Sequence, residues 1–236
     1  MPAIDIKDGK CVRLYRGLKG TEKVYYENPL ESIDFLINNG AKRVHLIDLN
    51  GAWGSKVNEA IINTIIEKTC NKVKIQIGGG IRSVESAIEY LEKGVDRIII
   101  GTLAVKNPNS LPKLIKTIGA DRIIIALDYK KNKIAIEGWE KEIDKSPYDY
   151  VKKIIDLGVI NILFTSIDND GTLSGPDFPH IKQMLNNIGN NRLFVAGGIR
   201  NEADILKLKK IGIAGVIIGK SFYENKISVS IFKNSI

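Results

Sequence analysis

A segment that occurs twice restricts the possible folds of this chain more than any other feature. Residues 75–102 align with residues 193–220 without a gap, at an offset of 118 residues. Both copies contain Gly-Gly-Ile-Arg, at 79–82 and 197–200, and both carry an Ile-Ile-Gly run near their end. Since the offset is half of the 236-residue chain, the sequence predicts two similar halves.

A shorter match supports this division of the chain. Ala3-Ile4-Asp5 resembles Ala126-Leu127-Asp128, again about half a chain apart. Half of a parallel barrel would leave strand edges unpaired, so the repeat favours one domain made of two joined halves. We therefore expect a single domain over residues 1–236, with halves of about 1–119 and 120–236.

Each copy of the repeat has the pattern strand, glycine turn, helix, strand. In the second copy, residues 193–196 form an apolar run and Gly197-Gly198 allows a turn close to other backbone. Asn201 is suited to cap a helix that extends to about residue 210, and residues 215–219 form the next buried strand. Glycine-ended strands that precede helix amino termini present backbone N–H groups to an anion.

The rest of the chain also alternates strand and helix. The expected strands are residues 2–6, 43–48, 73–77, 97–100, 122–127, 161–165, 193–196 and 215–219, with an extra short strand at 133–136. The expected helices are residues 30–39, 58–68, 84–93, 109–118, 178–187 and 201–210, one opening at Ser146-Pro147 and one from about 226. Continuous apolar strands indicate a parallel sheet covered on both faces. The prediction is an α/β fold, a single (β/α)8 TIM barrel built from two similar half-barrels. A doubly wound sheet, the alternative, does not explain the repeat.

Composition excludes several classes of protein. No apolar run reaches transmembrane length, and Cys11 and Cys70 form no metal or disulfide pattern, so we expect a reduced cytoplasmic protein without a membrane partner. His45, inside an apolar strand, and His180 are the only histidines and form no metal pair. The net charge of +8 is spread over lysines without an aromatic-flanked basic cluster, which argues against nucleic acid.

Two carboxylates are expected at the carboxyl ends of barrel strands. Asp5 ends the first strand and Asp128 the fifth, and these strands face each other across an eight-stranded barrel. One carboxyl group can accept a proton while the other donates one if their surroundings separate their pKa values. Each aspartate could instead cap a loop amide.

The glycine turns predict two phosphate sites on either side of these carboxylates. Gly79-Gly80 pairs with Gly101, and Gly197-Gly198 pairs with Gly219. The glycines could equally serve only to make tight turns. Arg82 and Arg200 are suited either to phosphate or to an acidic residue on the following helix.

Together these residues resemble a known family over essentially the whole chain. The chain resembles ProFAR isomerase, the histidine-biosynthesis enzyme that acts on phosphoribosylformimino-aminoimidazole-carboxamide ribotide. The motifs that carry the resemblance are Ala3-Ile4-Asp5, Gly9-Lys10-Cys11-Val12-Arg13-Leu14, Gln76-Ile77-Gly78-Gly79-Gly80-Ile81-Arg82, Asp170-Gly171-Thr172-Leu173-Ser174-Gly175-Pro176 and Ala196-Gly197-Gly198-Ile199.

The resemblance implies an Amadori rearrangement of an aminoaldose to an aminoketose, without metal or cofactor, on a bis-phosphorylated small molecule. It implies that Asp5 is the general base and Asp128 the general acid, with Asp170 as an alternative acid. Trp139 is expected either to stack on the imidazole or to pack, and Arg16 to close onto a phosphate. The residues expected to bind substrate or phosphate are Arg16, Asp48, Gly79, Gly80, Arg82, Gly101, Thr102, Trp139, Thr165, Gly171, Thr172, Gly197, Gly198, Gly219 and Lys220. A monomer is expected.

Three other functions remain open at this level. The cyclase subunit of imidazole glycerol phosphate synthase is similar in fold, but residues 16–21 lack the acidic run associated with it, and Gly138-Trp139 favours the isomerase. A dual-substrate isomerase that also acts on phosphoribosyl anthranilate is a second alternative. The third is a barrel that binds phosphorylated metabolites without catalysis.

Overall fold

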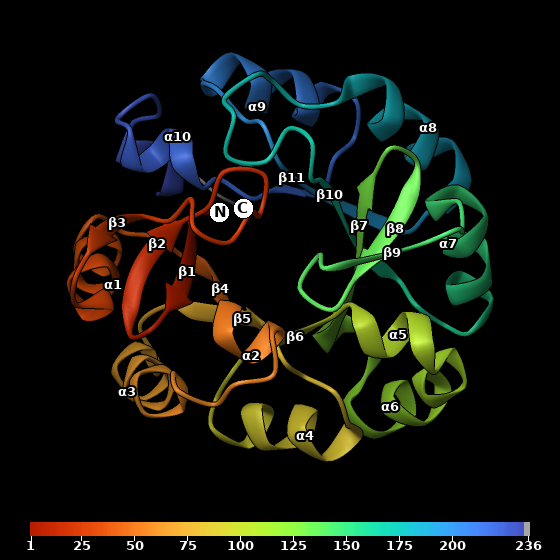
Figure 1. Cartoon of the computed structure of the whole chain (residues 1–236), viewed down its shortest axis with the longest axis horizontal. Helices are drawn as coiled ribbons and strands as arrows, with labels where there is room; N and C mark the ends of the chain where they lie inside the picture. Colours follow the sequence, from red (N-terminus) through yellow and green to blue (C-terminus); the bar gives the residue numbers. More distant parts are fainter. Residues whose placement is uncertain (234–236) are drawn as a thin grey trace.

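The strands of the protein lie side by side in one curled sheet, with the helices arranged around its outside (Figure 1). The computed structural model describes residues 1–233. Eight strands pair in parallel in the order β12-β11-β10-β7-β6-β5-β4-β1. They are β1 (Ala3–Lys7), β4 (Arg43–Asp48), β5 (Lys74–Gly78), β6 (Arg97–Ile100), β7 (Ile123–Lys130), β10 (Asn161–Ser166), β11 (Arg192–Ala196) and β12 (Gly215–Val216).

Two antiparallel extensions leave this parallel sheet at its carboxyl edge. Strands β2 (Lys10–Arg13) and β3 (Lys23–Tyr26) continue from β1, while β8 (Lys133–Ile136) and β9 (Lys141–Ile143) continue from β7. The β8 strand was expected, whereas β3 and β9 were not, because each is short and carries few buried side chains.

The longer helices cover the outer face of the sheet, and the short ones begin shortly after the carboxyl ends of strands (Figure 1). They are α1 (Pro29–Asn38), α2 (Leu49–Ala52), α3 (Glu59–Thr69), α4 (Val84–Glu92), α5 (Thr102–Lys106), α6 (Leu111–Ile118), α7 (Pro147–Asp156), α8 (Phe178–Ile188), α9 (Glu202–Lys210) and α10 (Lys220–Tyr223). The expected caps are present: Ser146 accepts a hydrogen bond from the N–H of Tyr148, and Asn201 accepts one from Asp204. Each cap satisfies a backbone donor that the helix itself leaves free.

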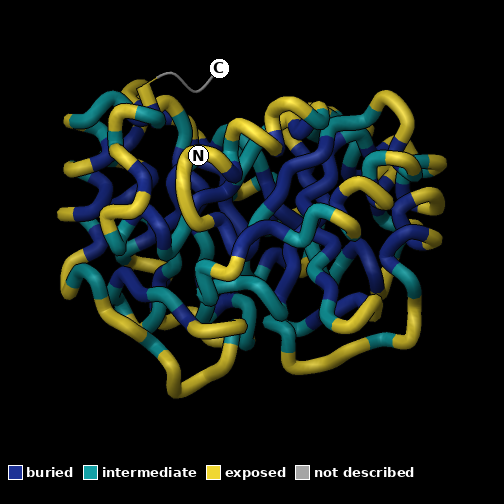
Figure 2. Tube along the Cα trace, turned by 90° about the horizontal axis from the view of Figure 1, so that it is seen from above, coloured by how far each residue is buried: buried dark blue, intermediate teal, exposed yellow. Residues whose placement is uncertain are grey.

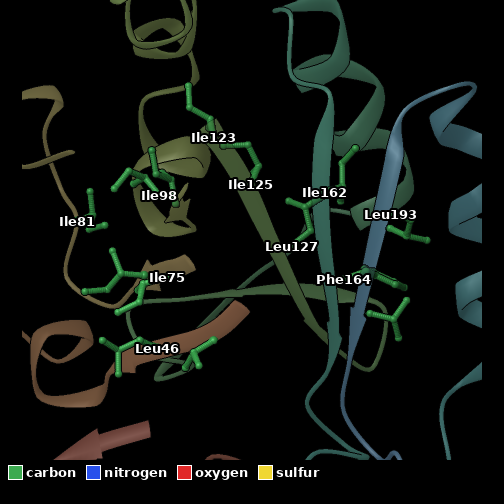
Figure 3. Packing of buried hydrophobic residues seen from close by; sticks show 14 of the residues in the cluster. Leu46, Ile75, Ile81, Ile98, Ile123, Ile125, Leu127, Ile162, Phe164 and Leu193 are labelled. Atoms are coloured by element: carbon green, nitrogen blue, oxygen red, sulfur yellow. The ribbon is translucent and has the colours of Figure 1, made fainter. Parts of the chain in front are cut away.

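Successive side chains of each strand point to opposite faces of the sheet, so the strands contribute to two buried apolar layers. Residues such as Leu46, Ile98 and Ile125 pack between the strands and the helices, in the larger cluster shown in Figure 3. The intervening residues face inward, where Ala3, Ile99, Ile124, Ala126, Leu163, Phe194 and Ile217 form a second cluster. Buried residues accordingly fill the middle of the molecule, and exposed ones lie around it in the loops and on the helices (Figure 2).

The two ends of the parallel sheet meet through backbone hydrogen bonds. The N–H of Ala3 donates to the carbonyl of Ile218 over 2.9 Å, and the N–H of Ile218 donates to the carbonyl of Met1 over 2.8 Å. Pro2 and Ile218 form an isolated parallel bridge. The last strand is shorter than the expected 215–219, since only Gly215–Val216 is regular.

One expected helix is absent. The segment from about residue 226 was predicted to be helical, but it holds a short 3-10 helix, Val229–Phe232, and residues 234–236 lie outside the described residues. Phe232 is buried against the core, so packing rather than helix formation fixes this end of the described chain.

Backbone angles follow the sequence repeat. Gly79 and Gly80 have φ values of 98° and 79°, and the equivalent Gly197 and Gly198 have 94° and 79°. All four are in the left-handed region that side chains rarely adopt. The repeated Gly-Gly sequence therefore forms the same backbone turn in both halves.

Candidate active site

A cavity of about 220 Å³ opens at the carboxyl ends of the parallel strands. Its floor is the inner apolar layer, and its rim is formed by the loops that follow the strands. The structure brings most of the predicted site residues to its lining, namely Asp5, Gly79, Gly80, Arg82, Gly101, Thr102, Asp128, Trp139, Thr165, Asp170, Gly171, Gly197, Gly198, Gly219 and Lys220.

Three carboxyl groups converge on this cavity. Asp5 comes from β1, Asp128 from β7 and Asp170 from the loop after β10. Burial raises the pKa of all three. For Asp170 the charges of Asp5 and Asp128 add to the effect of burial, although Arg13 opposes them, and the pKa reaches about 7. The site thus holds three carboxyl groups whose pKa values lie above the ordinary value, and that of Asp170 reaches the neutral range.

Asp5 is held by an arginine to which the sequence assigned no role. Arg13 on β2 donates from Nη1 to the Asp5 carboxylate and from Nη2 to the carbonyl of Ala3. Burial raises the Asp5 pKa, and the Arg13 charge and hydrogen bond counteract it. Arg13 therefore favours the ionised form of Asp5, as a general base requires.

Asp128 is held by a tryptophan from the β8–β9 loop. The indole Nε1 of Trp139 donates to Asp128 Oδ2 over 2.7 Å. Hydrogen bonds from Trp139 and Thr165 lower the Asp128 pKa, but burial outweighs them. A Cβ at Gly17, in the β2–β3 loop, would overlap the Trp139 ring, so this glycine lets the loop pack against the indole.

Both glycine turns are forced by close backbone packing. A Cβ at Gly79 would overlap the carbonyl of Asp48, and one at Gly198 would overlap the carbonyl of Gly175. Among residues 1–233, the N–H groups of Gly79, Gly80, Gly197 and Gly198 donate no hydrogen bond to the protein. The turns thus have a structural reason and also leave free donors at the cavity.

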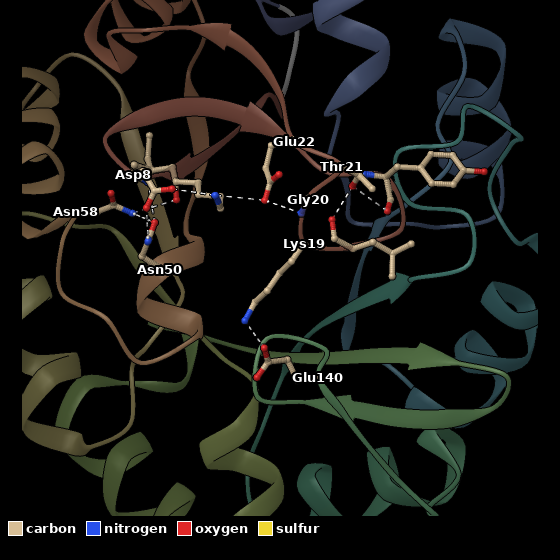
Figure 4. A network of polar contacts seen from close by, with 12 residues as sticks. Asp8, Lys19, Gly20, Thr21, Glu22, Asn50, Asn58 and Glu140 are labelled. Atoms are coloured by element: carbon tan, nitrogen blue, oxygen red, sulfur yellow. Dashed lines mark hydrogen bonds and ion pairs between the residues drawn. The ribbon is translucent and has the colours of Figure 1, made fainter.

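Three loops meet above the cavity. Lys19 in the β2–β3 loop forms an ion pair with Glu140 in the β8–β9 loop (Figure 4) and lies 4.5 Å from the centre of the Trp53 ring. Trp53 donates from Nε1 to the carbonyl of Gly138 over 3.3 Å. In the same view Asn50 bonds Asp8 and Asn58, which fixes the loop after β4 to the end of β1.

Among the described residues there is no group of three or more histidine, cysteine or acidic side chains arranged to hold a metal ion. Within the same part of the chain, no helix combines the length and the apolar character that a membrane crossing needs.

Comparison with known proteins decides the family. Residues 1–228 match the family described as Histidine biosynthesis protein. The chain belongs to this family. A protein of Methanosphaera stadtmanae is 44% identical over 97% of this chain and 95% of its own length. Proteins of Lachnoclostridium phytofermentans and Methanococcus voltae are 41% and 38% identical over 97% of this chain, and over 95% and 94% of their own lengths. All three are named 1-(5-phosphoribosyl)-5-((5-phosphoribosylamino)methylideneamino)imidazole-4-carboxamide isomerase. The suspected relationship to ProFAR isomerase is thereby confirmed.

Three predicted site residues of this histidine biosynthesis protein lie outside the cavity lining. The Arg16 side chain is exposed and stacks over Tyr15, although its N–H bonds the Asp170 carbonyl over 3.0 Å. Asp48 is buried, where it caps α2 and accepts a hydrogen bond from Asn58. Thr172 donates to the Asn169 carbonyl within its own loop.

The two repeat arginines have different partners. Arg200 pairs with Asp204 on the following helix, as the sequence allowed. Arg82 instead donates to the carbonyls of Gly51 and Ala52 and lines the cavity. Its guanidinium therefore fixes the loop after β4 at the edge of the cavity.

His45 was expected to be a packed strand residue, and it is buried between the strands. Its Nδ1 lies 2.8 Å from Gln76 Nε2, and burial lowers its pKa to about 3. It also reaches the cavity lining, which the strand pattern did not indicate.

Proposed function

We propose that this protein is an aldose–ketose isomerase of histidine biosynthesis that converts ProFAR to its aminoketose isomer, PRFAR, by an Amadori rearrangement. The observation that carries the proposal is that Asp5 and Asp128 line one cavity, between the two glycine-turn pairs. The names of the three relatives support the same substrate.

The proposed chemistry uses two proton transfers. Asp128, as the acid, protonates the ribose ring oxygen while the C–O bond opens to an imine. Asp5, as the base, removes the C2 proton, and the resulting enolamine tautomerises to the aminoketose. The Arg13 pairing supports an ionised Asp5 as the base. Asp128 has no such ion pair among residues 1–233, and burial raises its pKa, which supports it as the acid. Asp170, whose pKa is about 7, is the alternative acid.

The substrate phosphates are proposed to bind at the two repeats. One site uses Gly79, Gly80, Gly101 and Thr102, and the other uses Gly197, Gly198, Gly219 and Lys220. Free N–H groups at both turns support this assignment, since amides near helix starts bind phosphate. In this account Arg16 closes onto a phosphate when loops move, and Trp139 lies against the imidazole.

The fold proposed for this function is a closed (β/α)8 barrel formed by residues 1–236 as one domain of two similar halves. The hydrogen bonds of Ile218 with Ala3 and Met1 support closure, and the matching glycine angles support the duplication. A single barrel places both phosphate sites on the same rim.

The direct test is turnover by the purified protein. Incubation with ProFAR should yield its aminoketose isomer, which a coupled cyclase–glutaminase assay detects. No conversion of ProFAR, with saturable binding only, would favour a phosphometabolite-binding barrel. Turnover of the aminoketose to imidazole glycerol phosphate would indicate the cyclase, and parallel turnover of phosphoribosyl anthranilate would indicate a dual-substrate isomerase.

A further inference from the structure

Three arginines gather at the end of the sheet opposite the cavity. Arg43, Arg97 and Arg192 are the first residues of β4, β6 and β11. Side chains two residues apart on a strand share a face. The residues two positions later, His45, Ile99 and Phe194, face the inside of the sheet, so the arginines belong to the inner side at its amino end. The Arg97 guanidinium confirms this orientation, since it lies 5.8 Å from the centre of the Phe194 ring.

Their charges are incompletely neutralised. Arg43, Lys74 and Arg97 share one carboxylate, that of Asp96, and Arg192 pairs with Asp121. Four cations thus face two carboxylates. Arg97 is the least satisfied, because its contact with Asp96 spans 3.8 Å and it makes no side-chain hydrogen bond among residues 1–233.

The arginines lie within electrostatic reach of one another. The Arg97 side chain is only 18% exposed, and that of Arg43 is 19% exposed. Burial lowers the Arg97 pKa, and the positive charges of Arg43 and Arg192 lower it further, against the opposing effect of Asp96. Burying a guanidinium among other positive charges costs free energy, and a bound anion would offset that cost.

Two amide oxygens at the same end also have no partner. Gln76 Oε1 and Asn161 Oδ1 are buried and accept no hydrogen bond from the described residues. Gln76 is paired in register with Arg97, and Asn161 with Arg192. Buried polar atoms of this kind are normally satisfied by protein or by an ordered molecule. The protonated oxygen of a phosphate, or water around it, would supply the missing donor.

We propose that Arg43, Arg97 and Arg192 form a binding site for a phosphate-class dianion at the amino end of the sheet, separate from the cavity. With Lys74, which also reaches Asp96, the group carries two positive charges more than its two carboxylates balance, and this excess matches a phosphate or phosphate monoester. Guanidinium groups match the oxygens of such an anion in paired hydrogen bonds. This site is independent of the proposed isomerase reaction.

The test locates and measures anion binding in the whole protein. Crystals grown with tungstate, a phosphate analogue with an anomalous signal, should show an ion between the three arginines in addition to any ion in the cavity. In solution, inorganic phosphate should stabilise the wild type against thermal unfolding. The phosphate concentration that gives half of this stabilisation should be at least about tenfold higher for Arg97→Met. Arg97→Lys should be intermediate. Lys182→Met, which removes one exposed positive charge from α8, should behave as wild type.

The cavity does not confound this comparison, because its contribution is common to all four proteins. Loss of the ion at the arginines in Arg97→Met crystals, with cavity ions retained, would support the site. No ion at the arginines in the wild type, or an ion that persists in Arg97→Met, would overturn it. An ion in the crystal without any difference between wild type and Arg97→Met in solution would mean an adventitious ion only, and would also overturn it.

Discussion

The indole of Trp139 and the carboxylate of Asp128 are joined by a hydrogen bond of 2.7 Å. This bond lowers the Asp128 pKa against the effect of burial. Trp139→Phe should therefore raise that pKa and move the basic limb of the kcat/KM pH profile to higher pH, with kcat lower by roughly tenfold. Trp53→Phe is the matched control, because its indole donates to the Gly138 carbonyl and not to a carboxylate. An unmoved basic limb in Trp139→Phe would argue against Asp128 as the acid.

The fit between Gly17 and Trp139 gives a second prediction. A methyl group at Gly17 would overlap the indole, so Gly17→Ala should displace Trp139 from Asp128 and reduce kcat by at least about tenfold. Gly20→Ala is a close control, since Gly20 has φ 86° compared with 64° at Gly17, but a Cβ there would meet nothing within 4 Å. Both variants carry backbone strain, so equal kinetic losses would show that strain alone is responsible.

Arg13 should set the protonation of Asp5. Arg13→Met removes the charge that opposes burial, so the Asp5 pKa should rise and the acidic limb of the pH profile should move to higher pH. At pH 7 we expect kcat/KM to fall at least about tenfold, while Arg13→Lys retains part of the activity. Thermal unfolding of each variant separates this effect from loss of fold. A profile that drops in height without shifting would contradict the electrostatic role.

Asp170 links stability to pH. The folded protein holds its proton up to a pKa of about 7, whereas the ordinary value is 3.8. The folded state therefore binds more protons in this interval, and the free energy of unfolding falls as pH rises through it, by at most about 1.4 kcal/mol per pH unit from this group.

Asp170→Asn should remove that contribution and stabilise the protein above pH 7. Urea unfolding at several pH values between 5 and 8 measures the slope. Asp168→Asn, in the same loop but outside the cavity lining, is the control. A slope in Asp170→Asn as steep as in the wild type would show that Asp170 titrates normally.

The sequence was most informative where the structure accepts only one kind of residue, as in buried strands and in turns with positive φ. Strands 43–48 and 97–100 were predicted with the bounds of β4 and β6, because continuous apolar runs between turn residues leave little choice. The glycine turns were found because only glycine fits positive φ beside another backbone.

Tertiary contacts explain what the sequence did not reveal. Arg13 occupies a short strand, and nothing in the pattern of Lys10–Arg13 shows that its side chain reaches Asp5. The short helices α2 and α5 span only four and five residues, too few for a helical periodicity, and α2 depends on close packing of Gly51 against Asp48 and the Gly79 carbonyl. The exposed position of Arg16 also depends on loop packing, which local sequence does not specify.

In the proposed reaction, opposed carboxyl groups transfer protons on a substrate held by both phosphate sites. The most direct test of this reaction is the single-turnover rate of Asp5→Asn with ProFAR, measured beside the dissociation constant of the same variant. We predict a rate lower by roughly a thousandfold or more and a dissociation constant within a few-fold of wild type. A rate within a few-fold of wild type would show that Asp5 is not the general base.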